Sequence, residues 1–120
     1  MKFEGKKLMI LSFSITTKAF LSGEKSVTRR FWKPAQLMRW QRARDEKRLI
    51  HDAWDRIPIA GGRKIGRFRL TARPYLERLK DMPESDLAAE GGMCRSIEEF
   101  IELVNKTPDT KAAVIRFEKL

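Results

Sequence analysis

The chain has a single cysteine, Cys94, and a single histidine, His51, so neither a disulfide nor a Cys/His metal cluster can hold its fold together. Stability must come from a hydrophobic core, and 42% of the residues are hydrophobic, including seven Phe and three Trp. In a chain of 120 residues this is enough apolar surface to close one core. The sequence therefore predicts one domain over residues 1–120, with no metal site and no cofactor.

Positive charge is concentrated in one part of the chain. The whole sequence has a net charge of +10, and the stretch 25–73 holds 15 basic and 4 acidic residues, a net charge of +11. A local positive field attracts polyanions and makes their binding depend on salt. The charge favours a nucleic-acid partner, although an anionic membrane would also be attracted and a basic face can serve solubility alone.

The apolar run from Leu8 to Phe13 is the only segment that invites comparison with a membrane or signal sequence. It is too short for a membrane span, which takes about 20 residues. No small-residue cleavage site follows it, so it does not match a signal peptide. We expect a cytoplasmic protein with no membrane partner.

Apolar periodicity and turn residues predict an α+β fold. The predicted strands are residues 7–13, 25–30, 54–58, 63–73 and 111–120. The predicted helices are residues 18–21, 35–48, 85–89 and 97–104. Thr16 or Thr17 is expected to cap the first helix and Gly23 to end it, and Ser96 with Glu99 forms a capping box at the start of the last helix.

Alternation along strand 25–30 sends Ser26, Thr28 and Arg30 to one face and leaves Lys25 at the loop edge beside them. This places an ammonium, a hydroxyl and a guanidinium group close together. They are the first candidates for a binding site.

Strand 63–73 has a polar and an apolar face. Alternation directs Arg67 and Arg69 to one face, and Phe68 and Leu70 to the other. The apolar face is expected to be buried. The positive face is either a ligand-binding surface or an ordinary outward sheet face, and the sequence does not decide between them.

The segment around the first candidates resembles the signature of the ASCH domains of the PUA-like superfamily, a helix followed by Gly-x-Lys-x-x-Thr-x-Arg entering a strand. Gly23, Lys25, Thr28 and Arg30 match this pattern. The later predicted strands and helices follow in the family's order, so the resemblance covers nearly the whole chain. It implies a small mixed β-barrel with flanking helices. Residues 31–56 are longer and more basic than the family's usual link and read as a basic insertion.

The resemblance implies binding of RNA or of modified nucleosides, and some small bacterial members hydrolyse the acyl amide of N4-acetylcytidine. By the motif, the residues used there correspond to Lys25, Thr28 and Glu90. Hydrolysis would require a neutral lysine to take the proton from the Thr28 hydroxyl. Burial and Arg30 would lower the pKa of Lys25 and Glu90 would raise it, so the sequence leaves the direction open.

Binding of RNA or another single-stranded nucleic acid is the leading interpretation. Single-stranded bases stack on aromatic side chains while basic side chains hold phosphates. Trp32, beside Arg29 and Arg30, is the preferred stacking residue, although each Trp can instead serve the core. The predicted binding residues are Lys25, Thr28, Arg29, Arg30, Trp32, Arg67 and Arg69. Amide hydrolysis, ribonuclease activity and a protein-interaction role are the alternatives.

Overall fold

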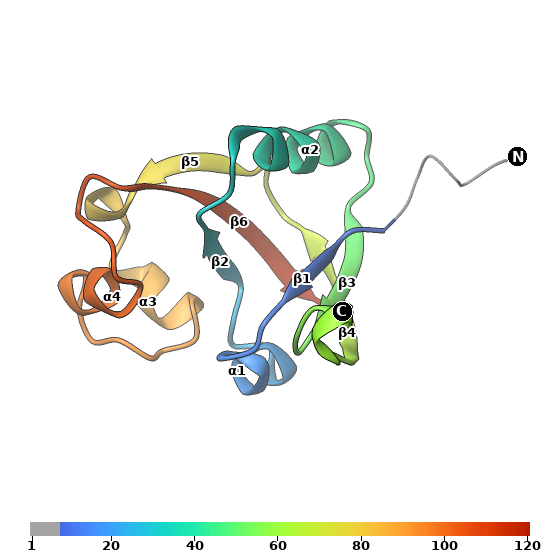
Figure 1. The fold of residues 1–120 in the computed structure, drawn as a ribbon, viewed down its shortest axis with the longest axis horizontal. Helices are drawn as coiled ribbons and strands as arrows, with labels where there is room; N and C mark the ends of the chain where they lie inside the picture. The colour runs from blue at the N-terminus through green and yellow to red at the C-terminus, as the bar shows by residue number, and fades with distance from the viewer. Residues whose placement is uncertain (1–7) are drawn as a thin grey trace, which may run out of the picture.

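A computed structural model describes residues 8–120 and shows a mixed α+β fold, in which four α-helices surround a strongly curled six-stranded half-barrel (Figure 1). The predicted fold class is confirmed. Lys7, the predicted start of the first strand, lies outside the described residues.

The curled sheet is organised around its last strand. Its path runs through β1 (Ile10–Ser12), β3 (Ile50–Trp54), β4 (Lys64–Leu70), β6 (Lys111–Lys119) and β2 (Val27–Arg30), and β5 (Tyr75–Arg78) also pairs with β6. Only β1 and β3 are parallel among these pairs. β6 pairs with β4 near its carboxyl end and with β2 and β5 nearer its amino end, so one long strand joins both parts of the sheet.

The alternation predicted for the strands is confirmed where it concerns the core. Phe68 and Leu70 of β4 are buried, whereas Arg67 and Arg69 are exposed. β6 contributes Ala113, Ile115 and Phe117 to the main core, as its pattern predicts. The other members of that core are Leu11, Phe13, Phe20, Leu37, Trp40, Ala53, Phe68 and Leu70.

The helices are α1 (Thr17–Ser22), α2 (Pro34–Asp45), α3 (Ser85–Ala89) and α4 (Ile97–Leu103), with 3-10 turns at η2 (Pro58–Ala60) and η3 (Leu79–Asp81). Gly23 ends α1 in the left-handed conformation, with φ at 83°, and Ser96 Oγ accepts the Glu99 N–H at 3.1 Å, as predicted. Neither threonine caps α1: Thr16 makes no cap bond, and the Thr17 hydroxyl donates to the Phe13 carbonyl. Between residues 8 and 120 no helix has the length and apolar character to cross a membrane.

One strand was predicted at the wrong residues, and another strand was not predicted. The strand expected at 54–58 lies earlier in the chain, as β3, and ends at Trp54. Its position was missed because its buried residues are His51 and Ala53, and so polar a sequence gives a weak strand signal. β5 was not predicted. It is a short edge strand whose Leu76 is exposed and whose sequence has no apolar alternation.

Residues 31–56, predicted to be a basic insertion, supply both α2 and β3. α2 buries Leu37, Trp40 and Ala43. β3 pairs with β1 on one side and β4 on the other. The segment is therefore part of the core and of the sheet.

Candidate functional site

A hollow of about 290 Å³ is lined by the three residues that the ASCH resemblance assigns to hydrolysis: Lys25, Thr28 and Glu90. We call it the Lys25 hollow. Its wall comes from the loop after β1, from β2, from the end of α3 and from α4. The lining residues are Ser12, Phe13, Ser14, Ile15, Thr16, Lys25, Thr28, Arg29, Glu90, Met93, Phe100, Leu103 and Val104.

Backbone hydrogen bonds fix the loop that carries Lys25. Its N–H donates to the Ala19 carbonyl of α1, at 3.0 Å, and the Ser26 N–H donates to the Ala89 carbonyl of α3, at 2.9 Å. Glu90 follows α3 directly, before Gly91, whose φ is +128°. A Cβ at Gly91 would lie 3.0 Å from the Thr16 Cγ2, so a glycine suits both the turn and the close approach.

Lys25 is 3% exposed and forms an ion pair inside the hollow. Its Nζ donates to the Glu90 backbone oxygen at 2.6 Å and to Glu90 Oε1 at 3.2 Å. Burial lowers the pKa of Lys25 below its ordinary value, and the opposing effect of Glu90 does not cancel it. The direction that the sequence left open is therefore downward.

Thr28 and Arg30 share a face of β2, as alternation predicted. Thr28 is 4% exposed, and its Oγ1 accepts from Arg30 Nε at 3.1 Å. A second Arg30 nitrogen donates to the Ser12 carbonyl at 2.7 Å, and the guanidinium lies 5.4 Å from the centre of the Phe13 ring. Burial lowers the pKa of Arg30 to about 10, so it keeps its charge at neutral pH. Arg30 does not line the Lys25 hollow.

Thr28 and Lys25 line the same hollow but have different hydrogen-bond partners. In the part of the chain that the structure describes, no hydrogen bond joins Lys25 Nζ to Thr28 Oγ1. The lysine is held by Glu90, and the hydroxyl is held by Arg30. The nucleophile and base of the hydrolysis interpretation thus line one hollow without the direct contact that activation of the hydroxyl needs.

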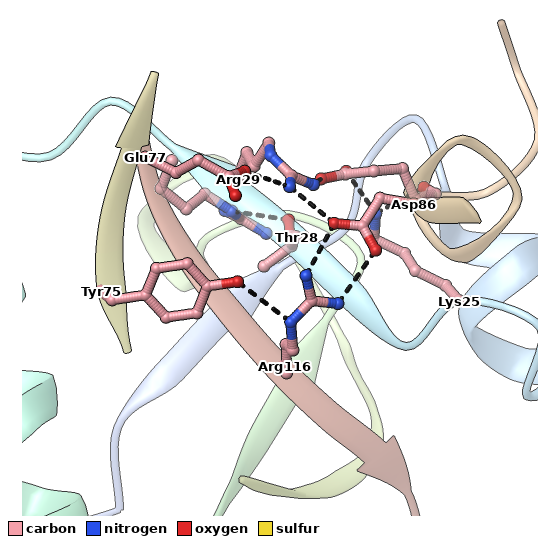
Figure 2. Close-up of polar contacts among 9 residues, drawn as sticks. Lys25, Thr28, Arg29, Tyr75, Glu77, Asp86 and Arg116 are labelled. Atoms are coloured by element: carbon pink, nitrogen blue, oxygen red, sulfur yellow. Dashed lines mark hydrogen bonds and ion pairs between the residues drawn. The ribbon is translucent and has the colours of Figure 1, made fainter. Parts of the chain in front are cut away.

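Arg29, predicted to contact nucleic acid, lines the hollow but is largely buried, and three carboxylates hold it (Figure 2). Its guanidinium lies 2.7 Å from Glu77, 2.6 Å from Asp86 and 2.9 Å from Glu90. Burial alone would lower the pKa of Arg29, but these carboxylates raise it above its ordinary value. A side chain held in this way orients Glu90, and both terminal nitrogens of its guanidinium already donate to carboxylates of the fold.

Sequence reasoning missed the residues that complete this cluster. Arg116 on β6 donates through two nitrogens to Asp86, at 2.9 Å and 2.8 Å, and through Nε to the Tyr75 hydroxyl at 3.2 Å (Figure 2). Asp86 is not among the residues predicted for the site. Its partners lie 57 and 30 residues away in sequence, so no local pattern connects them. The one sequence signal for this cluster is Arg116, a charged residue on the predicted strand 111–120.

The remaining predicted binding residues lie elsewhere. Trp32 packs on Trp40, with ring centres 5.5 Å apart and 20° between the planes. Arg67 pairs with Asp52 at 3.3 Å and Arg69 with Glu118 at 3.6 Å on the exposed face of β4. None of the three predicted residues lines the Lys25 hollow. Their roles in ligand binding stay predictions.

Residues 8–120 hold no group of three His, Cys, Asp or Glu side chains that could bind a metal ion. His51 lies in the core, where its Nδ1 accepts the Met9 N–H at 3.0 Å and its Nε2 contacts the Arg48 carbonyl at 2.8 Å. Both ring nitrogens are therefore used to tie β3 to its neighbours.

The fold and the site define a half-barrel α+β protein with a charged hollow between β2, the end of α3 and α4. No family model and no curated protein matches the sequence. Among solved structures, the chain is similar to protein EF3133 from Enterococcus faecalis V583, described by the family model DUF984, with a TM-score of 0.59 and 17% identity. The match covers 94% of this chain and 80% of that one. At this identity the likeness shows the fold alone.

Proposed function

We propose that the protein binds single-stranded nucleic acid, RNA in the first place, and that the Lys25 hollow receives one base or modified nucleoside of it. The observation that carries this proposal is the composition of the hollow. An ammonium group, a carboxylate and a hydroxyl lie together beside the apolar side chains of Phe13, Phe100 and Val104. A base needs both an apolar surface and hydrogen-bonding groups for its edge.

The ASCH resemblance supports the same proposal, since its motif residues Lys25 and Thr28 line this hollow. Exposed basic side chains would hold the phosphates, and Arg67 and Arg69 stay candidates for this role. Arg29 acts differently: as a positioning residue it holds Glu90 in place, since its guanidinium is already bound by carboxylates. Arg30 positions the Thr28 hydroxyl in the same way.

Fluorescence anisotropy with a labelled single-stranded RNA tests the proposal. Binding should be measurable at low salt, and the logarithm of the association constant should fall with the logarithm of salt concentration by about 0.7 per phosphate contacted. Thr28→Val, which keeps the side-chain shape, should weaken binding about tenfold, the order expected for losing one buried hydrogen bond. Thr71→Val, at an exposed threonine after β4, is the matched control. A wild-type protein that binds no RNA or DNA at low salt would refute the proposal.

Amide hydrolysis of an N4-acylated cytidine is the second candidate, because the lowered pKa of Lys25 is the direction that a general base requires. In this reaction the Thr28 oxygen would attack the amide carbonyl, the cytidine amine would leave with a proton, and water would release acetate from the threonine. The absent hydrogen bond between Lys25 and Thr28 in residues 8–120 ranks it below binding.

The hydrolysis candidate predicts that the protein releases cytidine from N4-acetylcytidine, as measured by liquid chromatography. Thr28→Ala should abolish the release, and Thr28→Ser should retain part of it. Substrate left intact at high protein concentration would exclude this candidate without affecting the binding proposal. No observation favours the ribonuclease alternative, because the ring nitrogens of His51 are already bonded in the core and burial lowers its pKa.

A further inference from the structure

A second concave surface, the Trp32 groove, lies between α2 and the strands β5 and β6. It has a volume of about 530 Å³. Its lining residues are Trp32, Pro34, Leu37, Met38, Gln41, Tyr75, Leu76 and Lys111. It shares no lining residue with the Lys25 hollow. In Figure 1, α2 lies at the top of the molecule, whereas α3 and α4, beside the Lys25 hollow, lie at the lower left.

Both aromatic side chains of the groove are held in place by the fold. One face of the Trp32 indole is covered by Trp40, at 5.5 Å between ring centres, so the part of Trp32 that lines the groove is its remaining surface. The Tyr75 hydroxyl accepts from Arg116 Nε, which fixes the phenol ring (Figure 2). Aromatic surfaces that are already ordered lose little conformational freedom when a flat ligand binds.

The polar groups of the groove suit the edge and the charge of a nucleotide. The Gln41 Nε2 donates to the Pro74 carbonyl at 2.9 Å, which orients the amide and leaves its Oε1 as an acceptor. The Lys111 ammonium forms no ion pair with any residue from 8 to 120. The lining contains no Asp or Glu, so every formal charge on it is positive.

Positive charge continues beyond the groove along α2. Met38 also lines a neighbouring hollow of about 260 Å³, whose other lining residues are Ala35, Arg39 and Arg42. Within the described chain neither arginine has a carboxylate partner, and Arg39 bonds only the Gln36 amide. An aromatic groove with a cation inside it and two arginines beside it matches a base flanked by phosphates.

We infer that the Trp32 groove is a second base-binding site, which stacks one base of a single-stranded nucleic acid on Trp32 and Tyr75. Lys111 contacts the phosphate on one side, and Arg39 and Arg42 contact the phosphates on the other. A protein helix is a poorer occupant, because the groove would then present three unpaired cations to it. The inference rests on the proposed function and extends it from one base to two separate positions on the strand.

Met38→Glu tests this inference, because Met38 is 56% exposed and its substitution places a negative charge in the groove without changing the core. Ile59→Glu, at a residue exposed on η2, is the matched control with the same change in net charge. In anisotropy titrations with single-stranded RNA, Met38→Glu should weaken binding at least about tenfold more than the control does, the effect expected for losing one stacked base. Equal thermal unfolding of the two variants shows that folding is retained.

A set of oligonucleotides, each with one abasic position, separates the contribution of base stacking to binding from that of the phosphate charge. For the wild-type protein, removing the base that occupies the groove should weaken binding. In Met38→Glu the same abasic position should no longer weaken binding, whereas the abasic position whose effect depends on Thr28 should weaken it as before. Equal binding by Met38→Glu and Ile59→Glu would refute the groove and leave the proposed function standing. A wild-type protein that binds no oligonucleotide would refute both. A wild-type dimer that Met38→Glu converts to a monomer in sedimentation velocity would assign the groove to a second copy and overturn the inference.

Discussion

Arginine is abundant in two regions with opposite surroundings. One is the outer surface of α2, and the other is the charge cluster at the Lys25 hollow, which consists of Arg29, Arg116, Glu77, Asp86 and Glu90. In the cluster, Arg29 is 7% exposed and three carboxylates bind it, while Arg116 forms a paired contact with Asp86. On α2, Arg39, Arg42 and Arg44 are exposed, and the described residues give them no ion pair. The same residue type serves the fold in one region and is free for a ligand in the other.

This difference changes the meaning of the net charge. The stretch 25–73 carries a net charge of +11, but Lys25 and Arg29 within it are neutralised by Glu90, Asp86 and Glu77, which lie outside it in sequence. A local charge count therefore overstates the surface available to a polyanion. The exposed arginines of α2 are among the charges of that count that a ligand can reach.

The largest expected effect is a loss of stability when the buried charge cluster is disrupted. Asp86→Ala removes the carboxylate that Arg29 and Arg116 share and leaves two guanidinium groups short of a partner in or near the interior. Removing one partner of a buried ion pair costs about 3–5 kcal/mol, and the partial exposure of Arg116 favours the lower end of that range. The free energy of unfolding in urea measures the loss.

Asp45→Ala is the matched control, since Asp45 and Arg73 form an exposed pair at 3.0 Å. Exposed pairs contribute little to stability, so the control should leave the urea midpoint nearly unchanged. If Asp86→Ala unfolded at the same urea concentration as Asp45→Ala, the cluster would not stabilise the fold and the comparison between the two regions would fail.

The next largest effect is a loss of the stability that the buried cluster provides when the pH is lowered. Burial would raise the pKa of Asp86, but the hydrogen bonds from Arg116 and Arg29 outweigh it and lower the pKa below its ordinary value. The contribution of Asp86 to stability is therefore present above the ordinary pKa of about 3.9 and is lost as the pH falls through the lower pKa of the folded protein. Urea midpoints measured from pH 6 to pH 3 should fall less in Asp86→Asn than in the wild type. Parallel curves for the two proteins would contradict this assignment.

On the exposed side, Arg39→Gln with Arg42→Gln should leave stability unchanged and weaken binding to single-stranded RNA. Loss of two phosphate contacts should reduce the slope of log K against log salt by about 1.4. Unfolding in urea should match the wild type because both side chains are exposed and unpaired with any carboxylate of residues 8–120. An unchanged salt slope would show that α2 does not contact the strand.

Sequence patterns predicted the parts of the molecule that depend on neighbours along the chain. The inward residues of β4 and β6, the end of α1 at Gly23 and the Ser96 cap follow from local spacing. The motif also identified Lys25, Thr28 and Glu90, which line one hollow. The carboxylates around Arg29 depend on contacts across 48 to 61 residues, and β5 is a strand only because β6 is beside it. Such features need the tertiary structure.

The smallest expected effect concerns Arg67 and Arg69, which the sequence also assigned to nucleic-acid binding. Both are exposed on β4 and already paired with Asp52 and Glu118, and neither lines the Lys25 hollow or the Trp32 groove. The double change to alanine should alter the free energy of unfolding by less than about 0.5 kcal/mol. It should weaken RNA binding only about threefold, because Asp52 and Glu118 compete with phosphates for the two guanidinium groups. If it weakened binding as much as Arg39→Gln with Arg42→Gln does, the bound strand would have to cross β4.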